Sequence, residues 1–193
     1  MRIVISAVAA VTLAGVTAGA QPSPPLTPGE SAPQFIAPQS PPAATGSLPN
    51  AMTRDFLTQA AANDQFSIEI GGLAVDRAED ELVRQVARKI VADRNEAARK
   101  LRDAAQKARM PAPVAQLTAE QRGMLNDLQK LGGAAFDRAY IAAQQKAQAI
   151  AIKIFETYAQ SGESADMIVF AKTTLPILQA HKEAVDKLAD SRA

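Results

Sequence analysis

The stretch Ala134–Gln160, AAFDRAYIAAQQKAQAIAIKIFETYAQ, decides the fold class, because apolar residues recur through it every three or four positions. That spacing places them on one side of an α-helix. The members of this stripe are Tyr140, Ala147, Ala151, Phe155 and Tyr158. Gly162 follows the stretch, where a helix C-terminus is expected. We therefore predict one helix roughly 40 Å long, at 1.5 Å per residue.

Three other stretches show the same spacing and a similar length, which predicts three more long helices. They are Met52–Ala78, Glu79–Ala108 and Ser164–Asp190. Between the second and third long helices, Thr118-Ala-Glu-Gln121 has the spacing of a capping box and predicts a short helix, which Gly132-Gly133 ends. Helices of nearly equal length pack side by side, so the predicted fold is all-α, an up-and-down four-helix bundle with one short extra helix.

The composition agrees with closely packed helices and excludes several classes of protein. Hydrophobic residues make up 47% of the chain but aromatic residues only 4%, so small side chains are expected at the helix contacts. So few aromatic residues argue against a β-sandwich or a β-barrel. The chain has no cysteine, which excludes a disulfide framework, a thiolate metal site and a cysteine nucleophile.

The N-terminal part of the chain predicts export. Residues 1–20 have the form of a signal peptide, with a basic residue, an apolar run and a small-residue cleavage site that ends at Ala20. An uncleaved N-terminal anchor is the alternative. Residues 21–50 hold nine of the twelve prolines and predict a Pro-rich disordered linker, so the bundle domain is expected over 51–193. We expect the mature protein in a bacterial periplasm or otherwise outside the cytoplasm.

The charge balance bears on the partners of the mature chain. Removal of Arg2 with the signal peptide lowers the count of Lys and Arg from 21 to 20, which equals the 20 Asp and Glu residues. A formally neutral chain lacks the basic field that nucleic-acid binding requires, so we predict no nucleic-acid partner. No segment after the signal peptide has the 18 or more apolar residues of a membrane-spanning helix. Contact with a membrane surface is an alternative without direct support.

Four segments between Arg54 and Leu188 carry a resemblance to a known family. They are AANDQFSIEIGGLAVDRA, VARKIVADRNEAARKL, GAAFDRAYIAAQQKAQAIAIKIFETYAQSGES and FAKTTLPILQAHKEAVDKL. In this order they resemble a large bacterial family of secreted proteins described as domain of unknown function 4142, whose members are labelled outer-membrane or periplasmic proteins. The resemblance implies a ferritin-like bundle and little established chemistry.

The resemblance also implies a set of site residues. The family pattern has a glutamate in the first helix and histidines in the second, third and fourth helices. Glu69 matches the glutamate, and His181 matches the last histidine. Arg94, directly after Asp93, stands where the second-helix histidine is usual, and Gln148 stands where the third-helix histidine is usual. This chain therefore lacks two of the four candidate metal ligands that the pattern offers.

Periodicity places Glu69, Arg94, Gln148 and His181 on the inward stripes of the four long helices, so we predict that they form one polar layer. A guanidinium repels a divalent cation and pairs with a carboxylate. We therefore predict an internal ion pair of Glu69 and Arg94, flanked by Gln148 and His181, without metal or cofactor. Two alternatives stay open: a weak metal site of His181 with Glu69 or Asp93, and an Arg94 side chain that reaches solvent.

The sequence holds no catalytic constellation. Its one histidine lies in a predicted helix without a strained nucleophile turn, and Asp93 and Glu96 are expected on a solvated helix face. We therefore predict a non-catalytic helical-bundle domain of the bacterial envelope that acts through contacts with an unknown protein or envelope partner. A metal-binding or redox ferritin-like protein and a peripheral membrane binder are the alternatives.

Overall fold

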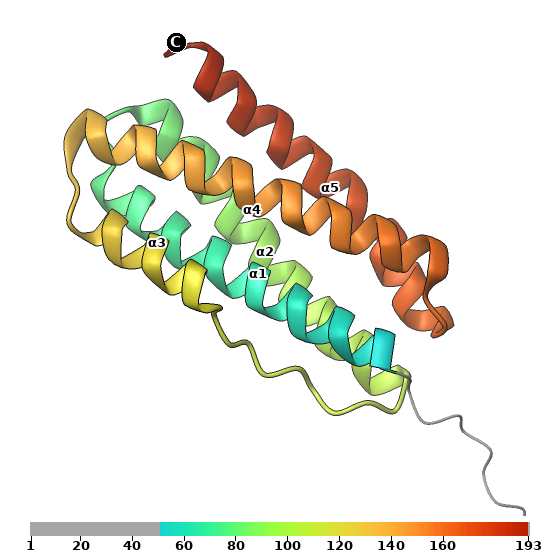
Figure 1. The fold of residues 1–193 in the computed structure, drawn as a ribbon. Helices are drawn as coiled ribbons and strands as arrows, with labels where there is room; N and C mark the ends of the chain where they lie inside the picture. The colour runs from blue at the N-terminus through green and yellow to red at the C-terminus, as the bar shows by residue number, and fades with distance from the viewer. Residues whose placement is uncertain (1–50, 193) are drawn as a thin grey trace, which may run out of the picture. The chain divides into compact units, whose positions relative to one another are not determined.

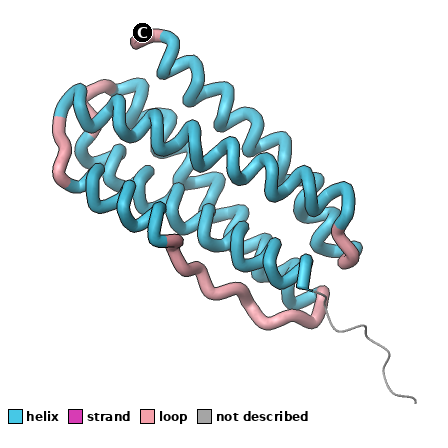
Figure 2. Tube along the Cα trace, in the orientation of Figure 1, coloured by secondary structure: helices cyan, strands magenta, loops and turns pink. Residues whose placement is uncertain are grey.

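The computed structural model describes residues 51–192, which are helical apart from turns and one long connection (Figures 1 and 2). The predicted signal peptide and the Pro-rich linker lie outside the described residues. The helices are α1 (Ala51–Arg77), α2 (Glu81–Lys107), α3 (Ala119–Gln129), α4 (Gly133–Ser161) and α5 (Ala165–Asp190). The four long helices begin and end within two residues of the predicted positions, and the all-α prediction is confirmed.

The four long helices form a ring in which α1 packs on α2, α2 on α5, α5 on α4 and α4 on α1. The start of α1 lies beside the end of α4, where the hydroxyl groups of Thr53 and Tyr158 are 2.8 Å apart. The end of α1 lies beside the start of α4, where the Asp137 carboxylate accepts from the backbone N–H groups of Glu79 and Asp80 at 3.1 and 2.9 Å. Neighbouring helices therefore run antiparallel, and α2 and α4, on one diagonal, run parallel.

A long connection between α2 and α4 makes this order possible, because it returns the chain along the length of the bundle (Figure 1). The second half of the connection is α3, which packs on α1 and α4. The predicted capping box is present: the Thr118 side chain accepts from the Gln121 N–H, and the Gln121 side chain accepts from the Thr118 N–H. Gly133 begins α4 with a φ of 56°, a conformation that glycine adopts without strain. One long crossover is typical of ferritin-like bundles, so the predicted ferritin-like bundle with one short extra helix is confirmed. The predicted up-and-down order of the four long helices was wrong, because the crossover makes α2 and α4 run parallel.

The core consists of two apolar clusters at the two ends of the bundle. The first cluster includes Phe56, Leu101, Phe155 and Phe170, and the second includes Phe66, Ile90, Phe136 and Val185. Buried polar residues separate the clusters on all four long helices. They are Asn63 and Asp64 on α1, Arg94 on α2, Gln148 on α4 and His181 on α5. A polar layer therefore crosses the bundle at mid-height.

Close packing of α1 on α2 depends on one glycine. A Cβ atom added to Gly71 would lie 2.5 Å from Cγ2 of Val91, whereas a Cβ added to Gly72 would meet nothing within 4 Å. The close contact between α1 and α2 is therefore made by Gly71 and not by Gly72. None of the described helices combines the length and the apolar character needed to cross a membrane.

Candidate functional site

The polar layer is built around the guanidinium of Arg94, which is 1% exposed. Arg94 Nη1 donates to Asp64 Oδ1 at 2.8 Å, and Nη2 donates to Gln148 Oε1 at 2.7 Å. Gln148 Nε2 in turn donates to Gln144 Oε1 at 3.1 Å. Burial raises the pKa of Asp64, and the neighbouring Arg94 guanidinium acts in the opposite direction. The layer thus joins α1, α2 and α4 through an internal ion pair and two amide side chains.

The predicted partner of Arg94 was wrong. Glu69 is only partly buried and accepts from Gln65 Nε2 of its own helix at 2.7 Å. Asp64 takes the place that was predicted for Glu69. The two residues are five positions apart, and five steps of about 100° place their side chains roughly 140° apart around α1. A long side chain at the edge of the buried face reaches water, while the short side chain of Asp64 faces the core. The alternative in which Arg94 reaches solvent is also wrong.

The layer contains polar atoms that the described protein groups do not pair. Asp64 Oδ2, Ser67 Oγ and Arg94 Nε are buried and have no hydrogen-bond partner among residues 51–192. Asn63 Nδ2 donates to the Ala147 carbonyl at 3.1 Å and fixes α1 against α4 at this level. Buried polar atoms without partners are costly, so this layer contributes less to stability than its contacts suggest.

His181 reaches the layer from α5 but pairs with a different acid. Its Nε2 lies 2.7 Å from Asp93 Oδ2, and the same oxygen accepts from Lys89 Nζ at 2.7 Å. Burial lowers the pKa of His181, the hydrogen bond to Asp93 raises it, and the charge of Arg94 lowers it, with a net lowering. Burial raises the pKa of Asp93, but the hydrogen bonds from Lys89 and His181 outweigh it and lower that pKa. At neutral pH the pair is a neutral imidazole that donates to a carboxylate.

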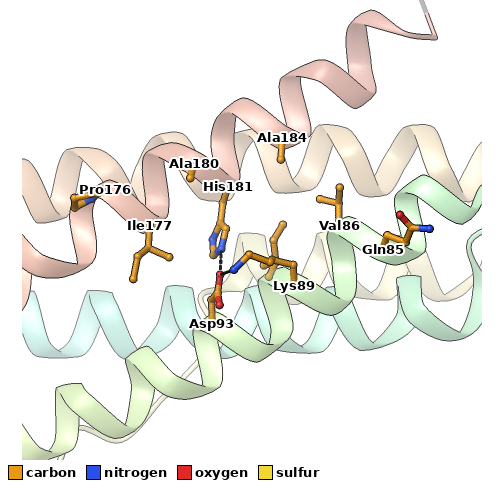
Figure 3. A pocket seen from close by; sticks show the side chains of 10 residues that line it. Gln85, Val86, Lys89, Asp93, Pro176, Ile177, Ala180, His181 and Ala184 are labelled. Atoms are coloured by element: carbon orange, nitrogen blue, oxygen red, sulfur yellow. Dashed lines mark hydrogen bonds and ion pairs between the residues drawn. The ribbon is translucent and has the colours of Figure 1, made fainter.

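The Asp93–His181 pair lies in a groove between α2 and α5 (Figure 3). The cavity measures about 540 Å³, and Val86, Ile90, Pro176, Ile177, Ala180 and Ala184 supply its apolar wall. Asp93 was predicted on a solvated helix face. Only 24% of its side chain is exposed, so it lies at the border between that face and the groove. Glu96, at 47%, does lie on that face and pairs with Arg99 and Lys100.

The residues of the layer do not fit a metal ion. No group of three His, Cys, Asp or Glu side chains within residues 51–192 could hold one. The two residues of the alternative metal site, Asp93 and His181, are joined directly by a hydrogen bond instead. Arg94 places a permanent positive charge between α1 and α4, and the single carboxylate beside it is already paired.

A four-helix bundle with one long crossover has the topology of ferritin-like folds. The chain belongs to the family described as "Domain of unknown function (DUF4142)", whose model matches residues 37–188. The resemblance noted in the sequence is thereby confirmed.

The comparison with solved structures bears on the fold of this chain. The chain is similar to a solved structure from Streptomyces coelicolor, a protein described as secreted and as DUF305, with a TM-score of 0.62. The similarity covers 74% of this chain and 96% of that chain at 14% sequence identity, so it shows the fold alone. No curated protein sequence matches the chain.

The sequence placed three of the four predicted residues correctly in the layer and missed four others. Arg94, Gln148 and His181 are buried at this level, whereas Asn63, Asp64, Ser67 and Gln144 were not predicted. A signal for Asp64 was available, because it follows Ala60 and precedes Ser67 by about one turn each, on a face of small residues.

Proposed function

We propose that this protein is an exported, non-catalytic helical-bundle domain of the bacterial envelope that acts through contacts with a partner protein. The observation that carries the proposal is the buried Arg94–Asp64 ion pair, extended by Gln148, at the level where the family pattern offers metal-type residues. A guanidinium there gives the layer a structural role and opposes divalent cations.

The arrangement of the titratable groups also supports a non-catalytic role. His181 Nε2 is held by Asp93 Oδ2, which also accepts from Lys89, so the pair ties α5 to α2. No hydroxyl group of the described residues hydrogen-bonds to His181, so the arrangement lacks the activated nucleophile of a Ser–His pair. Export is part of the proposal, and its support is the form of residues 1–20.

Metal-dependent stabilisation tests the proposal against its main rival, the metal-binding or redox protein. Wild-type protein, His181→Gln, Arg94→His and the double variant Arg94→His with His181→Gln are purified from the periplasmic fraction and melted with and without iron, manganese or zinc. We expect no shift in the melting temperature of the wild type at micromolar metal, because Arg94 repels the ion. Stabilisation of the wild type by metal, lost on His181→Gln, would contradict the proposal. If metal raises the melting temperature of Arg94→His but not that of the wild type, the proposal is supported. The loss of the metal site is then assigned to Arg94.

A further inference from the structure

The groove between α1 and α4 is the surface on which one helix of this chain is already bound. The apolar side of α3 packs into one half of the groove, where Leu128 is 2% exposed and belongs to the same cluster as Phe66. A charge pair orients it, because Lys146 of α4 binds Glu120 near the start of α3. Arg77 of α1 donates to the Gln129 carbonyl at the other end of α3, at 2.7 Å.

Within residues 51–192 no helix lies over the other half of the same groove, which we name the open half. It forms a cavity of about 540 Å³ between the first turns of α1 and the last turns of α4. Its apolar lining includes Met52, Phe56, Ile150 and Ile154, of which Met52 and Ile150 are 39% and 41% exposed. A volume of this size lies within the range of about 300–1,000 Å³ found for ligand sites.

The open half continues directly from the part that α3 covers. A smaller cavity of about 140 Å³ lies beneath the start of α3 and is lined by Met124 of that helix. Gln59, Ile150 and Ile154 line both this cavity and the open half. An apolar helix face bound in the open half would therefore extend the contact that α3 makes.

The α4 rim of the open half repeats the lysine that orients α3. Lys153 follows Lys146 by seven residues, which is about two turns, so the two ammonium groups lie on one side of α4. Lys146 is paired with α3, whereas Lys153 has no ion-pair partner among the described residues. Asp55 lines the α1 side, so the two rims carry opposite charges.

We infer that the open half binds an amphipathic helical segment of a partner protein, in line with α3 and with an acidic side chain against Lys153. The inference rests on the proposed function, because it names the kind of partner that a non-catalytic envelope domain would hold. A helix is favoured over an acyl chain, since the rims offer two opposite charges that a peptide can match and a hydrocarbon cannot.

Fluorescence titration of the full mature chain tests this inference. The chain has no tryptophan, so Thr157→Trp places a single reporter at the edge of the open half. The probe is a synthetic peptide with the sequence of residues 118–131, carrying Gly123→Ala to raise its helicity, because this sequence already fits the neighbouring half of the groove. We expect a saturable change in emission. Lys153→Glu should weaken binding about five- to tenfold, and a peptide with Glu120→Lys should restore it.

A matched charge reversal serves as the control. Lys172 is exposed on α5, away from the open half, so Lys172→Glu should leave the affinity unchanged. Binding that Lys153→Glu does not weaken, or no saturable change at millimolar peptide, overturns the inference. So does a larger response to vesicles of phosphatidylethanolamine and phosphatidylglycerol than to the peptide, because the occupant is then lipid. A dimer of the full chain that dissociates on Lys153→Glu makes a second copy the occupant, which also overturns it. These outcomes are independent of metal binding, which tests the proposed function alone.

Discussion

Replacement of Arg94 by methionine should lower the free energy of unfolding by about 3–5 kcal/mol. Methionine keeps most of the aliphatic volume but removes both hydrogen bonds, to Asp64 and to Gln148. The loss arises mainly because the Asp64 carboxylate, 1% exposed, is left in the core without a counter-charge. For a domain of this size, such a loss corresponds to a decrease in melting temperature of roughly 10–20 °C.

A double-mutant cycle separates this pair from the pair that the sequence suggested. Arg94→Met combined with Asp64→Leu should cost several kcal/mol less than the sum of the single changes, because no uncompensated charge remains. Arg94→Met combined with Glu69→Leu should be additive within about 0.5 kcal/mol, since Glu69 binds only Gln65. Urea unfolding of the wild type, the three single variants and the two double variants measures both couplings.

The pH dependence gives an independent check on the same pair. Arg94→Met removes the charge that lowers the pKa of Asp64, so burial raises that pKa further above its unfolded value. A carboxyl group with a raised folded-state pKa stabilises the fold progressively as the pH decreases through that pKa. The free energy of unfolding that Arg94→Met loses relative to the wild type should therefore be smaller at pH 4.5 than at pH 8. An equal deficit at both pH values, together with additive losses for Arg94 and Asp64, would refute the internal ion pair.

Two further changes probe other parts of the bundle. Burial lowers the pKa of His181, although the hydrogen bond to Asp93 raises it. Below about pH 6.5 the unfolded chain therefore binds a proton at this histidine that the folded chain does not bind. The free energy of unfolding of the wild type should decrease as the pH falls below that value. Urea unfolding of His181→Gln at pH 7.5 and 5.5 should show a smaller decrease, and an unchanged one would contradict the assignment. Gly71→Ala should cost about 1–3 kcal/mol by collision with Val91, with recovery on Val91→Ala, whereas Gly72→Ala should be neutral or stabilising in the same thermal melts.

The helices were predictable because each long helix repeats its apolar residues over many turns. Local chemistry marked the boundaries as well, at the capping box of Thr118 and at Gly132 and Gly133, where α4 begins. The direction of α4 was not predictable, because it depends on whether the connection after α2 turns back at once or crosses the bundle. Only the packing of α3 on α1 and α4 decides that question.

The sequence predicted Arg94, Gln148 and His181 in the polar layer, but the small residues around Asp64 did not by themselves decide between Asp64 and Glu69 as the acid. Every helix of a bundle buries a broad face, and both Asp64 and Glu69 border that face in the sequence pattern. The choice depends on how α1 is rotated about its axis, which is set by the contact of Gly71 with Val91 and by Asn63 against α4. These contacts form between different helices, so the sequence alone does not show which of them sets the rotation of α1.

The long crossover divides the bundle into two helical hairpins, α1 with α2 and α4 with α5. A slip of one hairpin along the other by one helical turn, about 5.4 Å, would change which side chains meet between them. The contacts of Arg94 with Gln148 and of Asp93 with His181 join the two hairpins at one level. A slip would break both at once and leave a buried guanidinium half paired. The polar layer thus favours one register of the two hairpins over the others, as a single buried asparagine does in a coiled coil.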